Sequence, residues 1–192
     1  MSGSALVRAA ARNNAEWCDA FCRTYGIVGR FDTDSWWSPV RGFRPLFRAE
    51  WLLREPGRAR AGSDRGWSAL TTQAQLVEWE STWAESHEAS GFFRPALLVD
   101  EAVGMLARYD GGRIVAGAVA NRSTTVIGLS NVFDAGGDQE SAWLGAAAAA
   151  NALWGQMPIV GYDTGAALDA ARRAGFESIG ELVVWLSRRL VG

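Results

Sequence analysis

Residues 110–187 constrain the fold more than any other part of the chain, because strand-like and helix-like segments alternate there with short turns between them. The turn at 110–112 carries two glycines, which supply the positive φ angles of a tight hairpin. Residues 113–121 and 124–133 are rich in apolar and β-branched side chains. This composition predicts two neighbouring antiparallel strands.

The second half of this stretch predicts two helices and two more strands. Residues 139–154 contain an alanine run with the highest intrinsic helix propensity. Residues 158–163 form a short strand, and 165–174 form a helix that ends at Gly175, a typical left-handed C-cap. Residues 181–187 are continuously apolar, so we expect a strand buried on both faces. The order of segments predicts an α/β (α+β) fold.

Upstream segments supply two further helices and one strand. Residues 5–25 repeat aromatic side chains at helical spacing, and 72–87 open with a threonine-to-glutamine capping box. In residues 43–54 apolar and polar side chains alternate in part, which predicts a first strand. We therefore divide the chain into 1–42, an N-terminal helix and Trp-rich loop that pack on the body, and 43–192, the main domain.

Composition argues against several classes of function. The chain has 192 residues and a formal net charge of −2, and all 19 basic residues are arginines. Because no basic face is evident, we expect no nucleic-acid partner. Its apolar runs are too short for a membrane span and no secretory leader is visible, so we expect a cytoplasmic protein that does not bind membranes. With Cys18, Cys22 and a single histidine, His87, we expect no metal site.

Two short phrases carry a resemblance to a known family. They are Ile-Val-Gly-Tyr-Asp at 159–163 and Arg-Arg-Ala-Gly-Phe at 172–176, set within the order hairpin, strand, glycine loop, helix, strand, helix, strand. Over residues 96–187 this resembles the C-terminal two thirds of a GNAT (Gcn5-related N-acetyltransferase) domain. The resemblance implies a mixed, mostly antiparallel central sheet flanked by helices, here with an N-terminal helical extension. It also implies acetyl-CoA or another acyl-CoA as cosubstrate and a small-molecule or peptide amine as acceptor.

In that family a glycine-rich loop before a helix holds the pyrophosphate of acyl-CoA through backbone N–H groups. The resemblance implies cofactor-binding roles for six residues of the matching stretch: Val132, Phe133, Gly136, Gly137, Gln139 and Ser141. The chain departs from the family pattern in its glycine spacing. It also places Asp134, Asp138 and Glu140 where the phosphates would lie. Each uncompensated like-charge pair at about 4 Å costs on the order of 4 kcal/mol at an effective dielectric of about 20.

The resemblance also implies where catalytic groups would lie. The family often carries a tyrosine in its last helix that protonates the leaving thiolate, and this chain has Ala171 there. Tyr162, at the end of the preceding strand, is the phenol that could replace it, or it packs in the core with its hydroxyl hydrogen-bonded. Ser130 and Asn131 lie on the strand beside the expected pantetheine arm. They could steer an amine or a water that acts as a base.

Glu50 is the one carboxylate in the apolar stretch 43–54. It could be a base with a raised pKa. Alternatively, it is an ion-pair partner of Arg48 or Arg44 on the face of the strand.

Two interpretations therefore stay open. In the first, the chain is an N-acyltransferase, with acyl-CoA between the strand that ends at Phe133 and the strand that begins at Pro158. An amine would attack the thioester directly, and a backbone N–H near Val132 would hold the oxyanion. In the second, the chain is a catalytically inactive GNAT-like binding or scaffold protein that has lost CoA binding, with homodimer formation through its apolar last strand.

Overall fold

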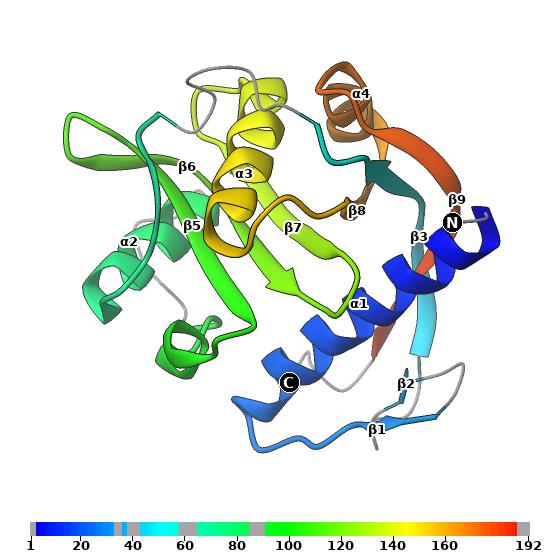
Figure 1. Ribbon diagram of the computed structural model, residues 1–192. Coiled ribbons are helices and arrows are strands. Elements are labelled where there is room, and N and C mark those ends of the chain that lie inside the picture. Colours follow the sequence, from blue (N-terminus) through cyan, green and yellow to red (C-terminus); the bar gives the residue numbers. More distant parts are fainter. Residues whose placement is uncertain (1–2, 33–35, 38–42, 58–64, 85–90, 188–192) are drawn as a thin grey trace.

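The computed structural model describes residues 3–32, 36–37, 43–57, 65–84 and 91–187 (Figure 1). The elements are α1 (Gly3–Arg23), β1 (Arg30–Phe31), β2 (Trp36–Trp37), β3 (Phe43–Arg54), β4 (Trp67–Ala69), α2 (Gln73–Trp83), the 3-10 helix η1 (Pro95–Val99), β5 (Val103–Asp110), β6 (Arg113–Arg122), β7 (Ile127–Asp134), α3 (Gln139–Trp154), β8 (Ile159–Asp163), α4 (Gly165–Arg173) and β9 (Glu177–Ser187). The helices and strands predicted downstream of residue 110 are all present. Their boundaries agree within four residues.

Within the described parts of the chain, seven strands form one sheet in the order β4-β5-β6-β7-β8-β3-β9. All neighbours in this sheet are antiparallel except β7 and β8, which are parallel. The predicted mixed, mostly antiparallel sheet flanked by helices is therefore confirmed. The sequence does not reveal that β3, from the N-terminal part of the chain, lies between the C-terminal strands β8 and β9.

Helices cover both faces of this sheet. Strand β3 shows which helices lie on which face, because successive side chains of a strand point to opposite faces of the sheet. Leu52 packs in the cluster formed by α3 and α4, whereas Trp51 and Leu53 pack in the cluster that includes α1. Helices α1 and α2 thus cover one face, and α3 and α4 cover the other.

Helix α1 runs across the sheet and contacts five of its strands, β3, β6, β7, β8 and β9 (Figure 1). Its buried positions include Ala10, Trp17 and Ala20, which lie on one face at helical spacing. Gly26, with φ of 72°, follows the helix in the left-handed conformation that is common after helix ends. The indole of Trp36 donates a hydrogen bond of 3.2 Å to Asp19 of α1, so part of the Trp-rich loop contacts this helix.

Helix α2 begins with the predicted capping box, formed by Thr72 and Gln75. Its Trp79 is fully buried and donates a hydrogen bond from the indole to the carbonyl of Leu106, at 2.8 Å. This bond satisfies the polar end of the side chain and fixes α2 on β5. The expected end of the helix, including His87, lies outside the described residues.

Helix α3 packs closely on the other face because its buried side is made of small residues, most of them alanine. Gly145 allows the closest approach: a Cβ added there would overlap the indole of Trp67 in β4. The small residues thus bring the helix within contact of β4, β5, β6 and β7.

Strand β9 differs from the prediction. It lies at the edge of the sheet, pairs only with β3 among the described strands, and has half-buried Leu182, Val183 and Val184 next to exposed Glu181. The expectation of burial on both faces is therefore wrong. An apolar run does not distinguish a central strand from an edge strand, because the difference depends on which other strand takes the neighbouring place.

Candidate cofactor site at the fork of β7 and β8

Strands β7 and β8 separate after a short paired section. They pair through Ile127 with Ile159, Gly128 with Val160, and Leu129 with Gly161. Beyond these pairs, β7 continues beside β6, and β8 continues beside β3. We call the widening space between the C-terminal ends of these two strands the fork.

A β-bulge lies in β7 at the beginning of the fork. Asn131 and Val132 together lie opposite a single residue of β6, and Asn131 has φ of 51°. Asparagine is one of the few residues that adopts this left-handed conformation readily. The extra residue reverses the alternation of side chains. Val132 therefore packs against the α3 cluster, whereas Phe133 packs edge-on against Trp79 of α2, with ring centroids 5.1 Å apart.

On the face covered by α1, side chains fill the beginning of the fork. The cavity that remains there has a volume of about 10 Å³ and is lined by residues that include Asn13 and Trp17 of α1, Trp51, Ser130 and Gly161. This volume is about the minimum that holds one water molecule. Ser130 also accepts a hydrogen bond of 3.1 Å from the side chain of Asn131.

Tyr162 lies on the same face, under α1. Its ring packs edge-on against Trp51, with centroids 5.7 Å apart and an interplanar angle of 83°. Burial, with smaller contributions from Cys18 and Asp163, raises the pKa of Tyr162 to about 12. The phenol therefore keeps its proton at neutral pH.

Glu50 lies on the opposite face of the sheet, toward α4. Its carboxylate contacts the guanidinium of Arg172 at 2.8 Å. A hydrogen bond with Ser178, followed by the charge of Arg172, lowers the pKa of Glu50, which is the opposite of the raised pKa expected for a base. Glu50 thus forms an ion pair, as the second interpretation expects, but its partner is Arg172 and not Arg48 or Arg44. Arg48 contacts another carboxylate, and the side chain of Arg44 lies outside the described residues.

The loop between β7 and α3 is filled by its own carboxylate. One oxygen of Asp134 accepts hydrogen bonds from the backbone N–H groups of Gly136, at 2.8 Å, and Asp138, at 3.2 Å. The other oxygen of Asp134 accepts a hydrogen bond of 2.8 Å from Arg108. The side chain of Asp134 is only 1% exposed. Gly137 completes the turn with φ of 83°. Two N–H groups of the predicted phosphate loop are thus already bonded to an anion.

The other two carboxylates of this region are also held by protein groups. Asp138 caps α3 by accepting a hydrogen bond of 3.1 Å from the N–H of Ser141. Hydrogen bonds from Ser141, first its side chain and then its backbone, lower the pKa of Asp138, so it is ionised at neutral pH. Glu140 forms an ion pair of 3.1 Å with Arg173 of α4. The first turn of α3 therefore carries two negative charges next to buried Asp134.

On the face covered by α3, Trp143 packs at the beginning of the fork. Its indole is 1% exposed and packs edge-on against Phe176, with centroids 4.9 Å apart. A Cβ added to Gly161, the last residue of β8 that pairs with β7, would lie 3.0 Å from this indole. One turn earlier in the helix, the side-chain oxygen of Gln139 is buried. Among the described residues, neither this oxygen nor the indole nitrogen of Trp143 has a hydrogen-bond partner.

From the sequence, Asp134 is predicted only as a charge that repels phosphate, and the contact of Trp143 with Gly161 is not predicted at all. The spacing Asp134-Ala-Gly136 could have predicted the hydrogen bond within the loop, because an aspartate side chain often accepts from the backbone N–H two residues later. The position of Trp143 carries no comparable signal, since its contact with β8 depends on how α3 lies on the sheet.

These residues do not fit acyl-CoA as they are arranged. Two N–H groups of the pyrophosphate loop are bonded to Asp134, and the first turn of α3 carries the carboxylates of Asp138 and Glu140. Three or more potential metal-binding side chains come together nowhere in the described parts of the chain. None of the described helices combines the length and apolar character needed to cross a membrane.

Comparisons with known proteins identify the architecture. Neither a scan against protein-family models nor a search of curated proteins finds a match. A GCN5-related N-acetyltransferase from Kribbella flavida is similar in structure, with a TM-score of 0.56 and 18% sequence identity over 76% of this chain. This chain spans 60% of that protein's length.

A second solved structure, a putative acetyltransferase of the GNAT family from Novosphingobium aromaticivorans, has a TM-score of 0.51 and 16% identity. The match covers 88% of this chain and 80% of that one. At these identities the similarity concerns the fold alone. By its fold, this chain is therefore similar to solved structures of GNAT acetyltransferases.

Proposed function

We propose that this protein is a non-catalytic binding protein of the GNAT fold that does not take up acyl-CoA in the loop between β7 and α3. The observation that carries the proposal is the carboxylate of Asp134, which accepts hydrogen bonds from the N–H groups of Gly136 and Asp138. In the GNAT enzymes that the chain resembles, such N–H groups hold the pyrophosphate.

A pyrophosphate would have to displace Asp134 to reach these N–H groups. Displacement breaks charge-assisted hydrogen bonds, each worth roughly 1.5–3 kcal/mol, and separates a buried carboxylate from Arg108. The incoming anion would also lie near the carboxylates of Asp138 and Glu140. Both effects oppose binding.

The packing at the beginning of the fork is consistent with the same proposal. Trp143 lies against Gly161 on the α3 face, and a cavity of about 10 Å³ remains on the α1 face. A cavity of this volume holds at most about one water molecule, so this part of the fork does not offer a binding channel.

A second candidate is an N-acyltransferase that moves an acetyl or other acyl group from acyl-CoA to an amine of a small molecule or peptide. The separation of β7 and β8 after three residue pairs favours it. For this candidate Tyr162, Ser130 and Asn131 remain the proposed catalytic residues. Glu50 lies on the other face of the sheet, where its carboxylate is bonded to Arg172.

Thermal unfolding with and without millimolar acetyl-CoA distinguishes the two candidates. A ligand at 100 times its Kd stabilises a protein by about 2.7 kcal/mol. For a chain of this size that stabilisation raises Tm by about 5–10 °C. We expect no concentration-dependent change in Tm. A rise of this size would overturn the non-catalytic proposal and favour the acyltransferase.

Separate titrations with ADP and with pantetheine would then locate any response. ADP tests the pyrophosphate loop alone, and pantetheine tests the fork alone. We expect neither to change Tm.

A binding protein of this kind could also form a homodimer, and we propose β9 as the contact, because its outer edge has no paired strand among the described residues. Light scattering after size-exclusion chromatography measures the mass directly. A dimer that is lost on Val183→Lys supports this contact. A monomer at all concentrations contradicts it.

A further inference from the structure

A hollow lies at the end of the sheet opposite the open end of the fork, where β6 ends and β7 begins. Its volume is about 520 Å³, within the range of small-molecule sites. It is lined by Glu16, Ala102, Arg122, Ser123, Thr124, Trp154 and Met157. These residues come from α1, from the turn before β5, from the end of β6 and the turn that follows it, and from the C-terminal end of α3 with the segment after it.

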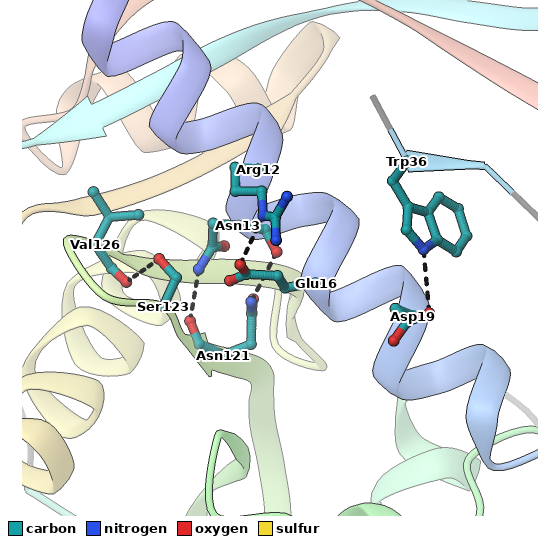
Figure 2. A network of polar contacts seen from close by, with 8 residues as sticks. All are labelled: Arg12, Asn13, Glu16, Asp19, Trp36, Asn121, Ser123 and Val126. Atoms are coloured by element: carbon teal, nitrogen blue, oxygen red, sulfur yellow. Dashed lines mark hydrogen bonds and ion pairs between the residues drawn. The ribbon is translucent and has the colours of Figure 1, made fainter. Parts of the chain in front are cut away.

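The uncompensated charge in this hollow is positive. Arg122 forms no ion pair with any described residue, and its guanidinium lies over the ring of Trp154, 5.9 Å from the centroid. The one acidic lining residue, Glu16, is neutralised by Arg12 at 2.9 Å, as Figure 2 shows. Of the two charged lining residues, Glu16 has a charged partner and Arg122 has none among the described residues.

The uncharged lining residues divide into a polar and an apolar part. The hydroxyl of Ser123 donates to the carbonyl of Val126 at 3.1 Å (Figure 2), and the exposed hydroxyl of Thr124 has no hydrogen bond within the described parts of the chain. Trp154 and Met157 supply the apolar part. A polar end and an apolar wall are thus adjacent.

We propose that this hollow binds a small carboxylate with an apolar or aromatic body. The planar guanidinium of Arg122 matches the two oxygens of a carboxylate, and the hydroxyl of Thr124 supplies another donor. The body of the ligand packs against Trp154 and Met157. A phosphate monoester fits less well, because a single guanidinium leaves part of its double charge uncompensated near Glu16.

Solution NMR of the full chain with phenylacetate as the probe tests this proposal. We expect saturable shifts of the Trp154 indole N–H and of the amides of Ser123 and Thr124. The uncharged analogue phenylacetamide should bind at least about tenfold more weakly, because it cannot form the charge-assisted contact. Absence of saturable shifts, or equal affinity for both compounds, would overturn the proposal.

Two matched arginine variants locate the contact. Arg122→Gln should weaken phenylacetate binding at least about tenfold. Arg113→Gln, at the other end of β6, should leave it unchanged. Both variants replace a surface arginine, and superimposable spectra elsewhere verify that each remains folded. Equal binding by both variants would show that Arg122 does not hold the carboxylate.

This result is independent of the acetyl-CoA titration. Phenylacetate binding concerns the hollow, whereas acetyl-CoA binding concerns the loop before α3. Failure of one proposal therefore leaves the other to be judged by its own measurement.

Discussion

Asn13 and Asn121 each donate a hydrogen bond from the side-chain amide to the backbone carbonyl of the other, at 3.0 Å in both directions (Figure 2). The two residues are only 2% and 5% exposed. Between them they join the middle of α1 to the end of β6. The neighbouring Gly128 provides the space, because a Cβ there would overlap the side-chain oxygen of Asn13.

This pair should contribute strongly to the attachment of α1. Asn13→Ala removes the donor to the buried backbone carbonyl of Asn121 and keeps the carbonyl of residue 13 that accepts from Asn121, so we expect a loss of about 1–3 kcal/mol in the free energy of unfolding. Urea denaturation of Asn13→Ala and Asn121→Ala measures the two losses. Asn14→Ala, which loses only a 3.9 Å contact with Cys18, is the matched control and should cost much less. A loss for Asn13→Ala no larger than that for Asn14→Ala would contradict the prediction.

Gly145→Ala should destabilise the protein although alanine favours helices. Alanine gains up to about 1 kcal/mol in an exposed helix, but overpacking a core typically costs about 1–3 kcal/mol. The added methyl group would overlap the indole of Trp67. We expect a lower Tm for Gly145→Ala. In a Trp67→Ala background the same substitution should become neutral or stabilising. A higher Tm in the native background would contradict the close approach of α3 to β4.

Asp134 should be important for stability. Asp134→Ala removes the acceptor of two loop N–H groups and the partner of Arg108, so we expect a loss of about 2–4 kcal/mol. Asp134→Asn keeps an oxygen for the N–H groups and should cost less. Chemical denaturation measures both values, with exposed Asp110→Ala as control. Near-equal costs for Asp134→Ala and Asp110→Ala would show that the loop does not depend on this carboxylate.

Stability should fall at alkaline pH because two half-buried acids, Cys18 and Tyr162, have raised pKa values. Burial, then the charges of Cys22 and Asp19, raises the pKa of Cys18 from 9.0 to about 12, and burial raises that of Tyr162 from 10.0 to about 12. The unfolded chain therefore ionises first. The stability that the two protonated side chains contribute is complete below about pH 9 and is lost as the pH rises toward their pKa values in the folded protein.

We expect the free energy of unfolding to decrease by about 2–3 kcal/mol between pH 7 and about pH 10.5. Urea denaturation at a series of pH values measures it. The variant Cys18→Ala should remove the larger part of this dependence, and Tyr162→Phe a smaller part. An unchanged pH profile in both variants would assign the alkaline loss to other groups.

Local chemistry in the sequence predicts most elements of the fold. The glycines at 111 and 112 have φ of 55° and 81°, as the hairpin turn requires. Helix α3 begins at Gln139 and ends at Trp154, as predicted. Such elements depend on neighbours in sequence, through propensity, capping and turn geometry, so a single chain is enough to predict them.

The candidate site could be predicted only in part. The loop at 134–138 and its acidic residues follow directly from the sequence, as does the conclusion that a phosphate would meet like charges there. The role of Asp134 as an internal ligand requires the positions of Gly136, Asp138 and Arg108. Likewise, the lowered pKa of Glu50 follows from Arg172 and Ser178, which are more than 120 residues away in the chain.

The sequence by itself determined the helices, most strands, the turn glycines and the resemblance to the GNAT fold, because those depend on local periodicity and short motifs. Tertiary structure alone decided that β3 separates β8 from β9, that Trp143 and α1 pack at the beginning of the fork, and that Arg122 lies over Trp154 beside a hollow. Each of these features joins segments far apart in the chain. Their positions follow from how whole elements pack, and no local pattern encodes that packing.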